Sequence, residues 1–282
     1  PEQRNERYEA LWQRGGFKFF LDGYNDIAMS EEANATLADF IRDKIREIVH
    51  DPEIAEKLLP DYFVMTKRPI LDDGYFETFN RDNVTLVDLR KEPIERFTET
   101  SVVTGEGEYP IDMLVLATGF DAISGSMLRL NPKGRGGLSL KDRWSERFHN
   151  YLGLTVAGFP NMFMITGPGS PSVLSNVIVS IEQHVEWISD LIVYMQQSGI
   201  VEVEADVTAE DNWVAHVNEV AASTLMPRAA SWYMGANIPG KPRVFMPYIG
   251  VAAYRRKCDE VVVNGYTGFV FDGSDEMPEQ TG

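Results

Sequence analysis

The chain has 282 residues, and its 43 acidic against 26 basic side chains give a formal net charge of −17. This acidity argues against nonspecific binding to nucleic acid or to an anionic membrane, because both require a basic protein face. A hydrophobic content of 44% with 24% charged residues is typical of a globular protein, and the length suggests about two domains.

The cysteine and apolar content narrow the possible classes of protein further. The single cysteine, Cys258, excludes an internal disulfide, a CxxC redox centre and a cysteine-based zinc site in this chain, and it fits a reducing, cytoplasmic compartment. The chain lacks an uninterrupted apolar run of about 18 residues, so no membrane helix is expected. It begins with Pro1 in a charged segment, from which we expect a piece of a longer protein.

The first third has the pattern of helices. Ser30 is a suitable cap for a helix whose first turn carries acidic residues, and apolar residues then recur at helical spacing from Leu37 to Val49. Asp51-Pro52 has the cap-then-proline order that begins a short second helix, which Pro60 ends.

Short strands are predicted after residue 62. Residues 83–89 alternate well enough for a strand, and residues 101–103 are a candidate partner. Two apolar runs, residues 111–117 and 162–165, are typical of strands buried on both faces of a parallel sheet.

The second apolar run leads into a glycine-rich turn and a long helix. Apolar residues from Val177 to Met195 have helical spacing, and Gly199 is a suitable terminator. Strand, turn and helix together predict one α/β unit. A further helix is predicted from a cap at Thr208, with Trp213, Val217 and Val220 facing inward.

The turn Gly167-Pro168-Gly169-Ser170-Pro171-Ser172 allows two interpretations. It lies where a nucleotide-binding turn belongs, and free N–H groups at the helix start would suit an electron-rich ligand. It lacks the last glycine of GxGxxG, however, and the same spacing fits a strand-to-helix turn in any α/β protein.

The pair Lys67-Arg68, followed by Pro69, is equally ambiguous. Most such pairs are solvated surface, and neighbouring side chains of an extended segment point in opposite directions. The functional interpretation assigns one cation to a phosphate and the other to a developing negative charge.

The segment 231–241 mixes Trp232 with two glycines, an asparagine and a proline, which suits a loop. The loop either fills a surface groove or closes over a ligand. The four histidines are scattered without metal-binding spacing, so no metal site is predicted, and the absence of a GxSxG elbow gives a hydrolase little support.

Read together, three segments resemble the flavin-dependent Baeyer–Villiger monooxygenases, and within them the phenylacetone and steroid monooxygenase group. They are Lys67-Arg68-Pro69 with residues 74–84, Leu116-Ala117-Thr118-Gly119-Phe120-Asp121, and Trp232 with Gly235-Ala236-Asn237-Ile238-Pro239-Gly240-Lys241. The loop 166–176 and residues 180–184 are also similar to that family. The resemblance covers nearly the whole chain, but only the carboxy-terminal half of such an enzyme.

This resemblance implies an α/β fold of two dinucleotide-binding domains, one for FAD and one for NADP, Rossmann-like, partial here and with a helical insertion. Residues 1–63 would be the helical insertion of the NADP domain, residues 64–105 the end of that domain, and residues 106–282 the carboxy-terminal part of the FAD domain. The two glycine-rich Rossmann turns of the family would belong to the missing amino-terminal half, which is therefore the expected partner.

The resemblance also implies roles for particular residues. Arg68 matches the active-site arginine, which also contacts NADP, and Lys67 matches the lysine at the 2′-phosphate of NADPH. Trp232 matches a tryptophan that holds NADP. Thr118 and Gly119, with Asn176 and Val177 at a helix start, would lie near FAD. The loop that shapes the family's substrate pocket is matched by Ser172, Val173, Leu174 and Ser175.

The activity implied is the NADPH- and O₂-dependent conversion of a ketone to an ester or lactone through a C4a-peroxyflavin. Two alternatives stay open. One is a related flavin monooxygenase that acts on sulfur or nitrogen. The other is a non-catalytic domain derived from such an enzyme, and the missing glycine turns favour this alternative. The isolated fragment is expected to be inactive.

Overall fold

The computed structural model describes residues 2–236, 238–240 and 247–272, and it divides the chain into two compact units, Pro1–Phe120 and Asp121–Gly282. The boundary does not test the three-part division expected from the resemblance, which stays a prediction.

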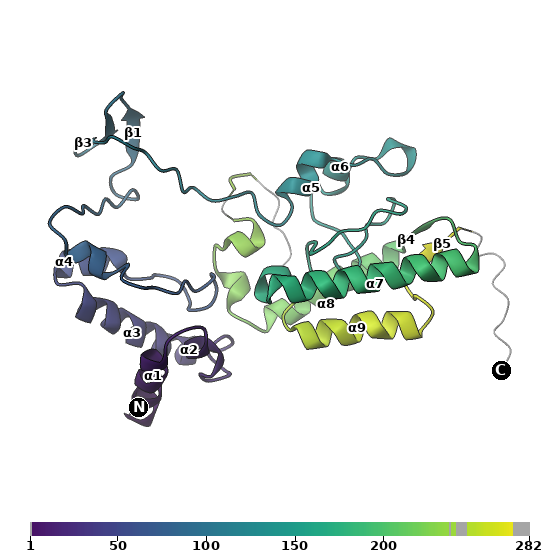
Figure 1. Cartoon of the computed structure of the whole chain (residues 1–282), viewed down its shortest axis with the longest axis horizontal. Helices are drawn as coiled ribbons and strands as arrows, with labels where there is room; N and C mark the ends of the chain where they lie inside the picture. The colour runs from purple at the N-terminus through teal and green to yellow at the C-terminus, as the bar shows by residue number, and fades with distance from the viewer. Residues whose placement is uncertain (1, 237, 241–246, 273–282) are drawn as a thin grey trace. The chain divides into compact units, whose positions relative to one another are not determined.

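The first unit is mainly helical, with one small sheet (Figure 1). Its elements are the helices α1 (Glu2–Arg14), α2 (Lys18–Leu21), α3 (Glu31–Ile48) and α4 (Pro52–Leu58), the 3₁₀ helix η1 (Glu77–Asn80), and the strands β1 (Ile94–Phe97), β2 (Ser101–Thr104) and β3 (Glu108–Pro110). The strands form an antiparallel sheet in the order β1-β2-β3.

The predicted caps explain where α3 and α4 begin. The Ser30 hydroxyl accepts a hydrogen bond from the N–H of Ala33, and the Asp51 carboxylate accepts from Glu53 and Ile54. Both predicted helix starts are thereby confirmed. The inward face of α3 packs against α1 and α2 in an apolar cluster of Tyr8, Leu11, Phe19, Ile27, Leu37, Ala38 and Val64.

The predicted strands of this unit are only partly confirmed. Residues 101–103 do lie in a strand, but its partners are β1 and β3, and residues 83–89 are not a strand. The apolar run 111–117 also forms no strand, and Met113 is 80% exposed. A strand of a parallel sheet needs hydrogen-bonded neighbouring strands along its edges and helices over its faces, and the described residues supply no strand partner to this run.

The second unit is built around one long helix, α7 (Val177–Ser198), which Figure 1 shows in green with α9 beside it. The other elements are α5 (Gly125–Leu130), η2 (Arg135–Gly137), α6 (Leu140–Arg143), η3 (Ser172–Leu174), β4 (Val203–Ala205), α8 (Val207–Ala222), η4 (Met226–Arg228), η5 (Trp232–Met234), α9 (Val251–Val263) and β5 (Phe269–Phe271). The strands β4 and β5 pair antiparallel.

Aromatic side chains dominate the core of this unit. Trp144, Trp187 and Trp213 are buried in one cluster with Leu191 of α7 and Cys258 of α9. The indole of Trp187 donates a hydrogen bond to the Cys258 carbonyl at 3.2 Å, which ties α7 to α9. Burial raises the pKa of the Cys258 thiol to about 12, so this cysteine is an inert core residue.

The predictions for this unit need correction at the start of α8 and at residues 162–165. Gly199 ends α7 with a left-handed φ of 68°, as predicted, but α8 is capped by Asp206, which accepts from Ala209, and Thr208 lies inside the helix. The carboxylate of Asp206 comes first in the chain and reaches the same free N–H groups. Trp213 and Val217 are buried as predicted, while Val220 is partly buried. Residues 162–165 form no strand, although Met164 is buried.

Candidate active site

A buried amide holds the backbone just before the cationic pair Lys67-Arg68. The Asn34 side chain, on α3 and 1% exposed, donates to the carbonyl of Val64 at 3.1 Å and accepts from the N–H of Val64 at 2.9 Å. The chain then turns, because Met65 has a left-handed φ of 69° and the Thr66 hydroxyl donates to the Phe63 carbonyl at 2.6 Å. The two cations therefore follow a turn that is anchored from the protein interior.

The two cations differ in their surroundings. The Lys67 ammonium lies 4.4 Å from the centre of the Tyr62 ring, which is a cation–π contact, and its side chain is half-buried. Arg68 is exposed. The ring restricts the lysine, while the arginine reaches solvent.

Thr118 and Gly119 lie at the end of the exposed run that closes the first unit. Gly119 has a φ of +88°, and a Cβ placed there would have nothing within 4 Å. Glycine is therefore favoured at this position by the backbone conformation and not by close packing of a neighbouring group.

The loop before α7 is fixed by a second buried amide. Asn150, with no exposed surface, donates to the Pro168 carbonyl at 2.7 Å and accepts from the Gly153 N–H at 2.8 Å. The two backbone segments approach so closely that a Cβ on Gly167 would lie 2.4 Å from the Gly153 carbonyl oxygen. The glycine turn noted in the sequence is therefore a packing requirement as well.

His184 holds the other side of this loop from within α7. Its Nδ1 accepts a hydrogen bond from the Thr166 N–H at 3.0 Å, so the proton of the neutral ring is on Nε2. The ring is fully buried, and burial lowers its pKa to about 4. His184 is therefore a neutral structural acceptor at ordinary pH.

The predicted substrate-loop residues lead directly into the start of α7. Ser172, Val173 and Leu174 form η3, and Ser172 is buried with a φ of 32°. The Ser175 hydroxyl donates to the Ser172 carbonyl at 2.8 Å and lies 2.6 Å from that of Ser180. Asn176 then caps α7 by accepting from the Ile178 N–H at 3.2 Å, and Val177 is its first residue.

Trp232 begins the short helix η5 and is half-buried against the Tyr233 ring, with ring centres 4.5 Å apart. The Ser231 hydroxyl caps this turn by accepting from the Tyr233 N–H at 3.3 Å. Asn237 and Lys241 of the same motif lie outside the described residues.

The predicted site residues thus form two sets. Lys67, Arg68, Thr118 and Gly119 belong to the first unit, and Ser172 to Val177 with Trp232 belong to the second. Within the second unit, the predicted substrate loop runs directly into the start of α7, and Ser175 links the two through the Ser172 carbonyl and the Ser180 hydroxyl.

The sequence does not identify the buried side chains that hold the backbone of the predicted site segments. Asn34 interrupts the apolar face of α3 beside Leu37 and Ala38, and this polar residue in an apolar stripe was a usable signal. Asn150 and His184 offered none, because their partners are backbone groups distant in the chain.

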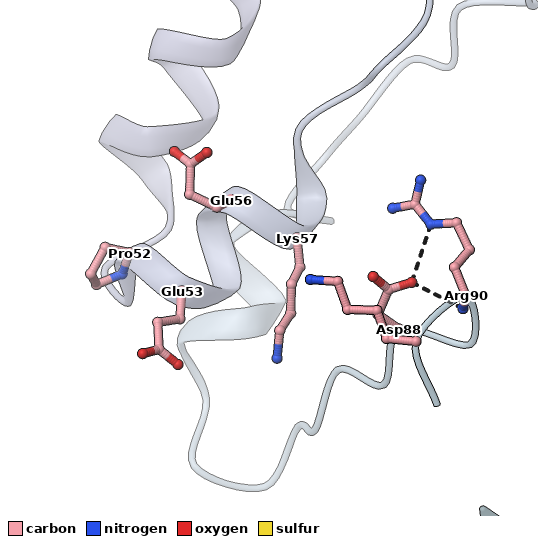
Figure 2. Close-up of a pocket in the computed structure, with 7 residues that line it drawn as sticks. Pro52, Glu53, Glu56, Lys57, Asp88 and Arg90 are labelled. Carbon is pink, nitrogen blue, oxygen red and sulfur yellow. Dashed lines mark hydrogen bonds and ion pairs between the residues drawn. The ribbon is translucent and has the colours of Figure 1, made fainter. Parts of the chain in front are cut away.

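A hollow of about 720 Å³ lies between α4 and residues 88–91 and is shown in Figure 2. Its lining mixes the charges of Glu53, Glu56, Lys57, Asp88, Arg90 and Lys91 with Pro52. Arg90 pairs with Asp88 at 3.2 Å, so much of this charge is neutralised locally. None of the predicted site residues lines it.

The described residues form neither a metal site nor a membrane-spanning helix. Within residues 2–236, 238–240 and 247–272, no group of three or more His, Cys, Asp or Glu side chains could hold a metal ion. Over the same residues, every helix is too short or too polar to cross a membrane.

Comparison with known proteins found close relatives, although no family model matches. The chain is 44% identical over 98% of its length to a Baeyer–Villiger monooxygenase of Pseudooceanicola batsensis, and covers 51% of it. It is 43% identical over 95% of its length to a phenazine N-monooxygenase of Lysobacter antibioticus, and covers 50% of it. The chain spans about half the length of the curated relatives it matches.

Solved structures give the same result. Cyclohexanone monooxygenase from Rhodococcus sp. Phi1 bound to NADP⁺ superposes with a TM-score of 0.92 at 42% identity, covering 96% of this chain and 51% of that one. A complex of OTEMO with FAD and NADP superposes with a TM-score of 0.91 at 36% identity, covering 96% and 50%. The chain therefore has the fold of about half of these flavoenzymes.

Proposed function

We propose, because the chain is homologous to about half of a flavin-dependent Baeyer–Villiger monooxygenase, that it is the carboxy-terminal half of an enzyme that oxidises ketones. The overall reaction balances as ketone, O₂, NADPH and one proton giving ester or lactone, water and NADP⁺. The observation that carries the proposal is the similarity over 98% of this chain to an enzyme named for that activity.

The residues on this chain fit FAD and NADP in the chemistry of their donors. Lys67 offers a compact charge for a 2′-phosphate, and the start of α7 offers the positive end of a helix dipole for an anion. Gly119 holds a backbone conformation that keeps side-chain bulk away from a ligand. Trp232 would contribute an aromatic surface beside NADP, and Thr118 a hydroxyl beside FAD.

When bound, FAD supplies the redox chemistry that activates O₂ with electrons from NADPH. The protein's task is electrostatic. Arg68 would hold a permanent positive charge where negative charge develops on oxygen, since guanidinium keeps its proton at any working pH. The loop Ser172–Val173–Leu174–Ser175, closed by the Ser175 bond to the Ser172 carbonyl, would shape the ketone pocket and keep water out.

Two exposed apolar surfaces support the proposal that another half completes the fold. In the first unit, most of the run ending at Phe120 is exposed, with Leu116 70% exposed. In the second, one side of α7 exposes Ile178, Val179, Ile181, Val185, Ile192 and Val193. Apolar surface of this extent is normally covered. The remaining half of the enzyme, with its two glycine-rich dinucleotide turns, would be the partner.

The phenazine N-monooxygenase among the relatives favours a second candidate function, oxygen transfer to nitrogen or sulfur. The complete reading frame that encodes this chain decides whether two GxGxxG turns accompany it. The full-length protein is then purified, examined for bound flavin, and assayed with NADPH on a cyclic ketone, an aryl ketone, a sulfide and an N-heteroaromatic compound.

Ester or lactone as the main product supports the ketone monooxygenase. Sulfoxide or N-oxide without ester would replace it with the second candidate. A protein without bound flavin and without NADPH oxidation would instead support a non-catalytic domain derived from such an enzyme.

A further inference from the structure

Asn34 is a polar residue on the apolar face of α3, where its neighbours Leu37, Ala38 and Ile45 are all buried. An amide in such a position is unfavourable unless its donors and acceptor are all paired. In this unit they are, because Asn34 makes three hydrogen bonds, and all three go to backbone groups of segments outside its own helix.

The bonds of Asn34 resemble those of a strand pairing with Val64. The amide nitrogen donates to the Val64 carbonyl, the amide oxygen accepts from the Val64 N–H, and the nitrogen also donates to the Ile27 carbonyl at 2.8 Å. One side chain thereby fixes both the position and the direction of the backbone at residue 64.

The chain between Val64, which Asn34 holds, and the cations Lys67 and Arg68 is short. Lys67 is three residues beyond Val64, and the turn between them is closed by Thr66, whose N–H and hydroxyl both donate to the Phe63 carbonyl. Thr66 itself is buried. Displacement of Val64 therefore moves Lys67 and Arg68, because the turn between them is closed by its own bonds.

We propose that Asn34 is a positioning residue for the pair Lys67-Arg68, and that it sets how strongly the enzyme distinguishes a 2′-phosphorylated nicotinamide dinucleotide from one without that phosphate. The inference rests on the proposed function, since it takes Lys67 as the phosphate contact. It assigns to the helix α3 a role in cofactor selection, exerted through the backbone that Asn34 holds at Val64.

Asn80 provides a matched control in the same unit. Its amide accepts from the His50 N–H at 2.9 Å and donates to the Ile48 carbonyl at 2.8 Å, so it also ties α3 to a later segment through two backbone bonds. It contacts no residue between 62 and 68 in these bonds. Loss of Asn80 therefore removes a tie between α3 and a later segment without disturbing the anchor of the cations, although with two bonds instead of three and at a less buried site.

The test uses the full-length protein carrying Asn34→Ala, with Asn34→Ser as a milder variant that keeps one polar atom should the first not fold. Calorimetry measures the dissociation constants of NADP⁺ and NAD⁺, and hydrogen exchange follows the amides of residues 63–68. We expect Asn34→Ala to weaken NADP⁺ about tenfold while NAD⁺ changes less than about twofold, with faster exchange at Val64. Asn34→Ser should change the ratio in the same direction, and Asn80→Ala should leave it unchanged.

Two results would overturn the inference. One is an unchanged ratio of NADP⁺ to NAD⁺ affinity in both Asn34 variants, and the other is an equal loss of that ratio in Asn80→Ala. Failure of the proposed function has a different signature, because the unaltered protein would then bind NADP⁺ no more tightly than NAD⁺.

Discussion

Asn150 gives the sharpest prediction on how the loop before α7 is held. Replacing it with alanine removes the donor to Pro168 and the acceptor for Gly153, and both backbone groups lie in the buried part of the second unit. The Gly153 and Gly167 segments are packed too tightly for rearrangement at low cost. Water therefore cannot easily replace the lost amide.

The expected magnitude follows from that burial. An unsatisfied buried backbone group costs roughly 1–3 kcal/mol, so Asn150→Ala should lower the free energy of unfolding by about 2–6 kcal/mol. Asn161 is the comparison, because it also accepts from one backbone N–H (Val203) and donates to one carbonyl (Val201), each at 3.0 Å, but Asn161 and Val201 are exposed and only Val203 is buried. Asn161→Gly, which suits the left-handed φ of 56° there, should cost only about 1 kcal/mol.

Urea unfolding of the full-length protein provides the assay. Tryptophan fluorescence reports on the second unit, since Trp144, Trp187 and Trp213 are buried in its core. We expect the midpoint to fall clearly further for Asn150→Ala than for Asn161→Gly. Equal shifts for the two variants would refute the reasoning, because burial of the bonded groups would then make no difference.

Three further predictions concern His184, Tyr62 and Lys67. Burial lowers the folded-state pKa of His184 from 6.5 to about 4, so the unfolded chain binds its proton first and stability falls as pH drops through that window, by about 3 kcal/mol in total. His184→Asn keeps an acceptor for Thr166 without titrating, and its unfolding midpoint between pH 7 and 4 should fall less steeply than the wild type's. Tyr62→Phe should leave the KM for NADPH unchanged, whereas Tyr62→Leu should raise it about two- to fivefold through loss of the cation–π contact; equal values would contradict that role. Lys67→Ala should raise the KM for NADPH far more than that for NADH, and an unchanged preference would remove the phosphate contact.

The helix ends could be predicted from sequence because their causes are local. Ser30, Asp51 and Gly199 act on backbone groups within a few residues, and each does so as expected. The cap of α8 was misassigned to Thr208 because Asp206 competes for the same N–H groups from a position two residues earlier.

The strands could not be predicted in the same way, because a strand depends on distant partners. The apolar run 111–117 has the composition of a buried strand, yet it is exposed, and nothing in its own residues identifies what covers it. In contrast, residues 101–103 form β2 because β1 and β3 lie nearby in the chain and pair with it.

The candidate site shows the same difference between residues with a local signal and residues that depend on distant partners. The residues that carry charge or form motifs, such as Lys67, Arg68 and the loop at Ser172, were identified from sequence, and their functional roles stay predictions. The residues that hold them, Asn34 and Asn150, were not, because an amide that pairs with remote backbone has no local signature. The cytoplasmic location expected from the single cysteine also stays a prediction.

The decisive measurement for the proposed ketone oxidation is the yield of ester per NADPH oxidised, compared between the full-length protein and its Arg68→Ala variant. We expect NADPH still to reduce the flavin of the variant, while ester formation falls by at least about a hundredfold and the electrons leave as hydrogen peroxide. An Arg68→Ala variant that makes ester with the wild-type yield would remove the role proposed for Arg68.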